Sequence, residues 1–189
     1  MSAGAADVIP GYEPEGELES AVARDPELVE GLAWGKPRHA HPEGSIGNHV
    51  ADLLRCIDTR GETGERRAAL RFIALVHDSF KGDVKSWLPR SGENHHAMRA
   101  RRFAERYTDD ERLLATIELH DRPYAIWKKM RRKGRLDQGA LEEVFERLPD
   151  HDLFLRFVEI DGDSEAKDPE PIEWLRGQMR ERELVPARG

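Results

Sequence analysis

The residue pair His77-Asp78 ends an apolar run that begins at Leu70, and Lys81 follows three positions later. An imidazole beside a carboxylate is costly to bury at the end of a helix unless something binds both groups. Histidine nitrogens together with carboxylate oxygens favour a divalent transition ion. The pair therefore predicts a metal centre, in which Asp78 could bridge two ions through its two oxygens.

Four further side chains stand in the same position, at one end of an apolar stripe with helical spacing: His49, His96, His120 and Asp161. Residues three, four and seven positions apart share one face of a helix, so each of these side chains is expected to point toward the core. Five helices that each direct a His or an Asp inward indicate one common site. For His96 alone, a hydrogen-bonded core histidine explains the position equally well.

Neighbouring polar residues fit this pattern less well. His95 shares its helix face with arginines, which places it toward solvent or toward the rim of a cleft. Asp163 lies two residues past Asp161 and off the apolar stripe. His39 and His41 fall in a loop, where surface histidines are common. We therefore assign the ligand roles to His96 and Asp161 rather than to their neighbours.

The stretch from Arg122 to Leu136 carries seven basic residues and no acid, with Tyr124 and Trp127 interleaved. One interpretation is capture of phosphate, with an aromatic ring available to stack on a base. The other is a solvated helix face with Trp127 in the core. The residues of this stretch support the two interpretations equally. Arg122, two residues after His120, is the member that we expect closest to a substrate.

Composition bounds the class of protein. The chain has 189 residues, of which 35% are charged, and its net charge is −7. That length suits one domain with a core, and that charge argues against general affinity for nucleic acid. The one cysteine, Cys56, excludes an intramolecular disulfide. No apolar run approaches the roughly 20 residues of a membrane span, and residues 1–16 do not resemble a signal peptide. We expect a cytoplasmic protein that does not contact a membrane.

The elements that must position the candidate ligands follow from capping residues and from the helical period. No alternation of period two is long enough for a strand. Residues 1–16 are expected to form a flexible tail and residues 17–189 one all-α domain, a helical bundle with a buried metal centre. Helices are expected over residues 25–34, from 45 past 57, from the 61–64 turn to 78, from about 94, from 108 to 123, and over 136–148, 150–161 and 171–183.

Three local strings resemble the HD superfamily of metal-dependent phosphohydrolases. His41-Pro42-Glu43-Gly44 with His49 downstream resembles the opening motif of many members, and His77-Asp78-Ser79-Phe80-Lys81 is similar to the His-Asp-x-x-Lys signature. Val158-Glu159-Ile160-Asp161 is similar to the closing helix that carries the last Asp. The resemblance covers about residues 38–165.

The resemblance implies a stand-alone helical domain of the HD type that hydrolyses a nucleotide or another small phosphate ester by attack of metal-activated water. In that family one ion is held by residues corresponding to His49, His77, Asp78 and Asp161. A binuclear subset holds a second ion, for which His96 and His120 stand in the intermediate positions.

Asp78 and Lys81 are the implied catalytic groups, and Lys81 and Arg122 the candidate phosphate contacts. The ion could be Mn²⁺, Fe²⁺, Co²⁺, Ni²⁺ or Mg²⁺. The sequence leaves open whether one ion or two are bound, whether monoesters or diesters are cleaved, and whether the chain forms oligomers.

A different class of function also fits. The chain could be a regulatory module without catalysis that binds a phosphorylated ligand or RNA through the basic surface from Arg122 to Arg135. Its binding would then be independent of metal and would weaken steeply with salt. A metal that only stabilises the helices is a third option. We expect a small-molecule partner, and the net charge disfavours nucleic acid.

Overall fold

The computed structural model describes residues 4–37, 44–163 and 168–186, and every regular element in these residues is a helix. The all-α prediction is therefore confirmed for this part of the chain. Short 3-10 helices lie at Ala5–Asp7, Lys81–Asp83 and Gly92–Asn94. In chain order the α-helices are α1 (Glu17–Val22), α2 (Pro26–Ala33), α3 (Ile46–Thr59), α4 (Gly64–Val76), α5 (His96–Ala104), α6 (Glu111–Leu119), α7 (Arg122–Lys133), α8 (Gln138–Glu146), α9 (His151–Asp161) and α10 (Glu170–Glu181).

Capping side chains fix the starts of several helices. The carboxylate of Asp25 accepts the N–H of Glu27 at the start of α2, and Pro26 occupies the first turn, where its missing N–H costs nothing. The hydroxyl of Ser45 accepts the N–H of Asn48 at the start of α3. Both helix starts were predicted from the sequence, and both are confirmed.

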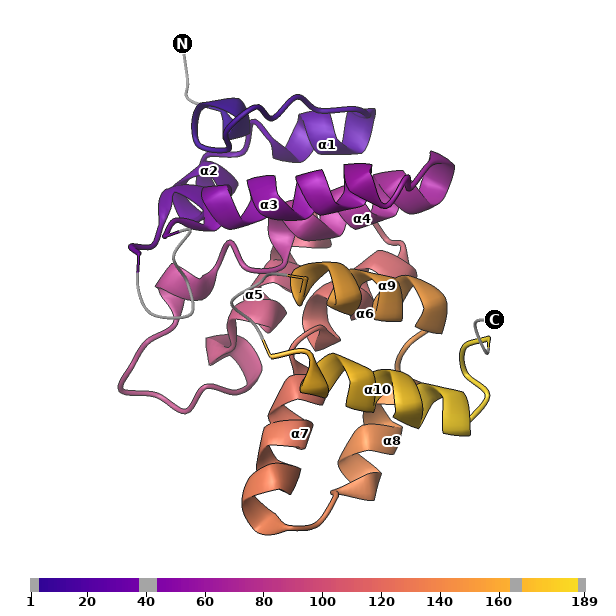
Figure 1. Ribbon diagram of the computed structural model, residues 1–189. Coiled ribbons are helices and arrows are strands. Elements are labelled where there is room, and N and C mark those ends of the chain that lie inside the picture. The colour runs from indigo at the N-terminus through magenta and orange to yellow at the C-terminus, as the bar shows by residue number, and fades with distance from the viewer. Residues whose placement is uncertain (1–3, 38–43, 164–167, 187–189) are drawn as a thin grey trace.

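The largest hydrophobic cluster surrounds α4. No residue from Leu70 to Phe80 is more than 4% exposed. The helix packs against α1, α3, α6 and α9, which lie around it in Figure 1. Because α4 is enclosed, its C-terminal end delivers His77 and Asp78 to the interior of the molecule.

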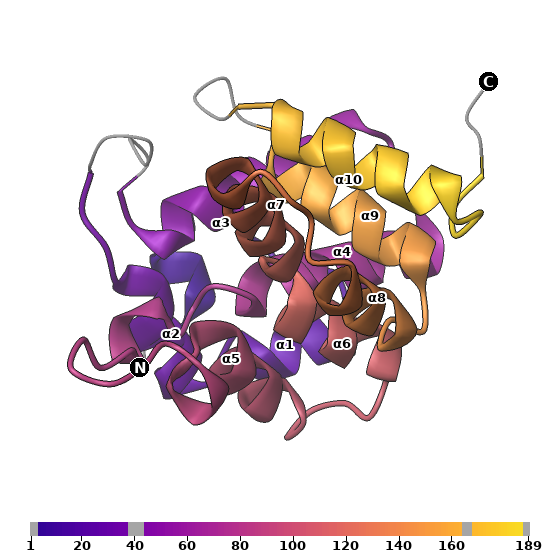
Figure 2. The same ribbon diagram turned by 90° about the horizontal axis from the view of Figure 1, so that it is seen from below.

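A second hydrophobic cluster joins α7, α8 and α10 to parts of α6 and α9. Its members include Ile126, Leu141 and Leu175, each of which is buried. Figure 1 shows α7 and α8 as a hairpin that projects from the rest of the molecule. In Figure 2, α10 lies beside α9 and near the base of α7, in agreement with its packing contacts.

The N-terminal segment differs from the expected flexible tail over residues 1–16. In its described part, the N–H of Ala5 donates to the carbonyl of Ala23 at 2.8 Å, and Ile9 and Tyr12 are buried. Burial of one large apolar side chain stabilises a fold by about 1.5–3 kcal/mol, which is enough to hold a short segment in place. Ile9 and Tyr12 belong to no periodic apolar pattern, so this packing could not be predicted from the sequence.

The basic stretch also differs from the expected boundaries. The helix expected to end at Pro123 ends at Leu119, and Pro123 lies in the first turn of α7. The helix α7 ends at Lys133, and the C-cap residue Gly134 has a φ of 70°, the left-handed conformation that glycine adopts readily. All basic residues of the stretch except Arg135 therefore lie on a helix. No helix in the described ranges has both the length and the apolar character needed to cross a bilayer.

Candidate metal centre

Backbone contacts orient two buried histidines toward the Asp78 carboxylate. His77 and His120 follow the last residues of α4 and α6, and each places its Nδ1 near the carbonyl oxygen three residues earlier. Those distances are 3.0 Å to Ala74 and 2.8 Å to Ile117. A carbonyl oxygen only accepts hydrogen bonds, so in the neutral rings Nδ1 carries the proton and Nε2 keeps a lone pair for a ligand.

Asp78 lies between two groups of candidate ligands. Its Oδ1 is 3.3 Å from Nε2 of His96 and 3.5 Å from Nε2 of His120, and its Oδ2 is 3.4 Å from Nε2 of His77. The first group contains His49, His77 and Asp78, and the second contains Asp78, His96 and His120. Within each group the ligand atoms lie within 4.8 Å of one another. One carboxylate is therefore placed to serve both groups.

The last predicted ligand joins the first group. Oδ1 of Asp161, at the end of α9, is 3.0 Å from Nε2 of His49 and 3.9 Å from Nε2 of His77. The structure thus brings together all six residues that the apolar stripes singled out. They come from five helix ends: α3, α4, α5, α6 and α9.

The donor atoms at the centre fit a cation. Nε2 of His77, Oδ1 of Asp78 and Nε2 of His96 are buried and have no hydrogen-bond partner among the described residues. Buried polar atoms in folded proteins almost always have a partner. Three such atoms gathered around the Asp78 carboxylate are compatible with divalent ions held by nitrogen and oxygen ligands.

The electrostatics of the site agree with this fit. Burial works against ionisation of Asp78, yet His77 and the ammonium of Lys81 hold the pKa of its carboxyl well below the usual range. Burial also lowers the pKa of His77. In His120 burial acts in the same direction, but Asp78 and the nearby carboxylate of Asp121 raise its pKa to about 9. The site therefore attracts positive charge strongly.

The two predicted phosphate contacts are placed differently. Lys81 pairs with Asp78 and lines the cleft above the centre. Burial alone would lower its pKa, but the charge of Asp78 raises it, so the ammonium stays protonated. Arg122 is exposed at the start of α7 and is not among the residues that line the cleft.

Asp121 belongs to the site and was not selected from the sequence. Its Oδ2 lies 3.5 Å from Nε2 of His95 and 3.7 Å from Nε2 of His96, and these three residues form a further ligand group. Its Oδ1 is buried without a hydrogen-bond partner. Asp121 follows the last turn of α6, so it continues no helical stripe. The sequence feature that could have identified Asp121 as a site residue was its position directly after His120.

A cleft of about 1090 Å³ opens above the centre. Residues of the centre form its floor, and Trp34, Tyr124 and Trp127 form aromatic walls. Trp34 is 41% exposed and Tyr124 is 51% exposed. The ring of Trp34 packs on Gly82, where an added Cβ would lie only 2.8 Å from the indole. The glycine after Lys81 therefore makes room for this wall.

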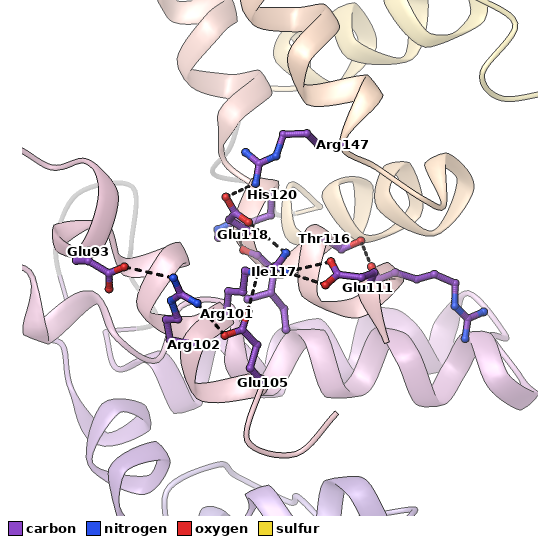
Figure 3. A network of polar contacts seen from close by, with 11 residues as sticks. Glu93, Arg101, Arg102, Glu105, Glu111, Thr116, Ile117, Glu118, His120 and Arg147 are labelled. Atoms are coloured by element: carbon purple, nitrogen blue, oxygen red, sulfur yellow. Dashed lines mark hydrogen bonds and ion pairs between the residues drawn. The ribbon is translucent and has the colours of Figure 1, made fainter. Parts of the chain in front are cut away.

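A network of ion pairs behind the centre fixes the end of α6. Figure 3 shows Arg101 of α5 paired with Glu118 and with Glu111, and Arg147 paired with the other oxygen of Glu118. The Arg101–Glu118 and Arg101–Glu111 distances are 3.2 Å and 2.8 Å. Because Glu118 precedes His120 by two residues, the network ties the helix that carries this ligand to α5 and to the end of α8.

The remaining sequence predictions concern loop residues. His39 and the string His41-Pro42-Glu43 lie outside the described residues, whereas Gly44 lines the cleft. Asp163 pairs with Arg60 at 2.8 Å and belongs to none of the ligand groups.

Comparison of the chain with protein-family models, curated proteins and solved structures found no match.

Proposed function

We propose that this chain is a metal-dependent phosphohydrolase of the HD type. The observation that carries the proposal is the position of Asp78, which is shared by two groups of candidate ligands at the floor of a cleft. A shared carboxylate suits a pair of ions close together, an arrangement that stabilises both the attacking and the leaving oxygen in phosphoryl transfer. The resemblance of the motifs around Asp78 and Asp161 to that superfamily supports the same function.

The residues divide between two ion positions. His49, His77, Asp78 and Asp161 would hold one ion, and His96 and His120, with Asp78, would hold the second. Divalent ions bound there would supply an acidified water as nucleophile and would polarise a phosphoryl oxygen.

Lys81 adds a positive charge of the protein itself to the floor of the cleft. Its ammonium lies beside Asp78, at the edge of the candidate centre. In the proposed reaction, it donates hydrogen bonds to the phosphoryl oxygens and stabilises the charge that develops on them. The backbone contacts at Ala74 and Ile117 hold His77 and His120 in the ligand orientation throughout.

The substrate class follows from the cleft. Its volume of about 1090 Å³ exceeds what an inorganic phosphate ion needs, because clefts of about 300–1,000 Å³ typically hold ligands as large as drugs. The aromatic walls offer contacts to an organic group attached to the phosphate. We therefore propose a nucleotide or another phosphate ester of similar size.

The test combines metal analysis with an activity screen. We expect about two equivalents of transition metal per chain after loading with Mn²⁺, together with hydrolysis of phosphomonoesters or phosphodiesters. Asp78→Ala should lose both metal and turnover. Asp83→Ala removes an exposed carboxylate five residues away and should retain both. Full activity of Asp78→Ala would contradict the proposal, and absence of metal and of activity under every loading would favour the non-catalytic binding module.

A further inference from the structure

The helix that carries two of the aromatic walls, α7, continues beyond the lining of the cleft. Tyr124 and Trp127 lie one turn apart on α7, and their rings are nearly parallel, with centroids 5.9 Å apart and 22° between the planes. The next turn adds cations on the same side of the helix. Nζ of Lys128 lies 5.9 Å from the ring centre of Tyr124, and the guanidinium of Arg131 lies 5.7 Å from that of Trp127.

These residues form a continuous strip, which we call the α7 track: Tyr124, Trp127, Lys128, Arg131 and Arg132. Lys128 and Arg132 are exposed, lie four residues apart and form no ion pair with a carboxylate in the described part of the chain. Arg131 is paired with Glu170 of α10, which holds this turn of α7 against the next wall of the cleft. The track therefore begins inside the cleft and ends in two unneutralised cations.

The charge of the track contrasts with that of the molecule. Residues 122–136, which include the α7 track, carry a charge of +7 in a chain of net charge −7, so the remaining residues carry −14. A local positive strip on a negative molecule selects polyanions that can follow the strip and repels those that must cover a wider surface. A narrow and flexible polyanion fits this requirement better than a rigid double helix.

The length of the track exceeds one nucleotide. From Tyr124 to Arg132 the helix rises about 12 Å, at about 1.5 Å per residue. Successive phosphates on one strand lie about 3.4 Å apart in a stacked nucleic acid, so this length spans about three of them. Flat rings for bases and cations for the backbone are the two elements of sequence-tolerant recognition of single strands.

We infer that the α7 track binds the end of a single-stranded nucleic acid and leads its terminal phosphate to the candidate centre. The inference rests on the proposed function for the hydrolysis of that phosphate, but the binding itself does not require turnover. It narrows the substrate from small phosphate esters in general to the ends of oligonucleotides.

The test measures binding by fluorescence anisotropy with the full chain as purified. The probes are a 12-nucleotide thymidine DNA and a 12-nucleotide uridine RNA, with phosphorothioate end linkages that resist hydrolysis, and a 12-base-pair duplex. We expect at least one of the single strands to bind more tightly than the duplex, with an affinity that falls as salt rises.

Variants then locate the binding surface. Lys128→Ala/Arg132→Ala should weaken single-strand binding at least about tenfold, and the slope of log K against log salt should become shallower by about 1.4, which is about 0.7 for each lost phosphate contact. Trp127→Leu should weaken binding with an unchanged slope. Arg24→Ala/Lys85→Ala removes the same charge from exposed positions outside α7 and should bind as the wild type does.

Three results would overturn the inference: no binding of either single strand at 50 mM salt (roughly the low end of the usual range), equal weakening in the two double variants, or preference for the duplex. An assay of mononucleotide hydrolysis distinguishes failure of this inference from failure of the proposed function. Metal-loaded Arg24→Ala/Lys85→Ala, which leaves the α7 track and the cleft lining intact, should hydrolyse a mononucleotide as fast as the wild type does. If neither protein hydrolyses any ester while the strand still binds, the proposed function fails and the binding surface stands.

Discussion

The carboxylates of the centre set the charge state of His120. Burial alone would lower the pKa of this histidine, but Asp78, Asp121 and Asp161 raise it to about 9. A proton on His120 and an ion at the same point are therefore alternatives. In the protein without metal, the imidazolium partly replaces the cation that the carboxylates attract.

This charge state predicts how the stability of the metal-free protein depends on pH. The folded pKa of His120, about 9, lies above the ordinary value of 6.5. Its protonation therefore stabilises the fold fully below pH 6.5, and this contribution is lost as the pH rises through 9. We expect a loss on the order of 1–3 kcal/mol between these limits. Urea unfolding of chelated protein at a series of pH values measures it.

A variant isolates the contribution of that histidine. Metal-free His120→Gln should show little change in unfolding free energy between pH 6.5 and 9. A wild-type protein whose stability is equally flat in this range would contradict the assigned charge state.

Residue spacing predicted which side chains gather at the candidate centre, because each lies at an end of a helical stripe. His49, His77, His96, His120 and Asp161 required only the helical period and the apolar pattern. Asp121 could not be found in this way, because the chain leaves helical geometry between α6 and α7. The position of Arg122 beside His120 suggested a place in the cleft, but the chain turns at Asp121 and Arg122 lies exposed outside the lining.

At the scale of elements, close packing of α2 positions the segment that carries the candidate ligands His77 and Asp78. An added Cβ at Gly31 would lie 1.9 Å from the carbonyl oxygen of Ser79, the residue after Asp78. Without a side chain at Gly31, the helix approaches this backbone directly. The sequence does not predict this contact, because by helix propensity alone Gly31 is an unfavourable residue within a helix.

This contact predicts opposite effects of the same substitution at two helical glycines. Gly31→Ala should lower the free energy of unfolding by about 1–3 kcal/mol, because the backbone of Ser79 cannot move without displacing Asp78. It should also weaken metal binding. Gly177→Ala in α10, where nothing lies within 4 Å of the added Cβ, should raise stability by about 0.4–1 kcal/mol. Thermal unfolding and metal titration of both variants measure this, and equal stability of the two would argue against the close contact.

Helix starts and the all-α class were predictable because Asp25 and Ser45 cap their helices through local contacts. The short helix α1 and the packing of the N-terminal segment were not. They depend on partners far away in the chain, such as Arg71 on α4, which no local pattern reports. The aromatic walls of the cleft depend in the same way on the approach of α2 and α7 from distant parts of the sequence.

At the scale of the whole molecule, a buried ion pair attaches the N-terminal segment. Nε of Arg71 donates to Glu19 at 2.8 Å, the hydroxyl of Tyr12 donates to the same carboxylate at 3.3 Å, and Arg71 also donates to the carbonyl of Glu13 at 2.8 Å. Arg71 and Glu19 are each 4% exposed. Removal of one partner would leave the other charge buried without compensation.

We therefore expect Arg71→Ala to destabilise the protein by about 3–5 kcal/mol. The double variant Arg71→Met/Glu19→Leu replaces the pair with apolar side chains of similar size and should recover most of that loss. Chemical denaturation of both variants gives the two free energies. A double variant as unstable as Arg71→Ala would show that the segment depends on the ion pair itself rather than on the absence of an unpaired charge.

The two sides of the cleft are synthesised in a fixed order, because they come from different parts of the chain. The candidate ligands end at Asp161, whereas α10 supplies Ile172 and Leu175 to the far wall. A ribosome synthesises the chain from the N-terminus, and folding begins before synthesis ends. The complete ligand set therefore leaves the ribosome before the wall that covers it. In the proposed centre, an ion would therefore meet a complete ligand set whose α10 side stays open until the last helix docks.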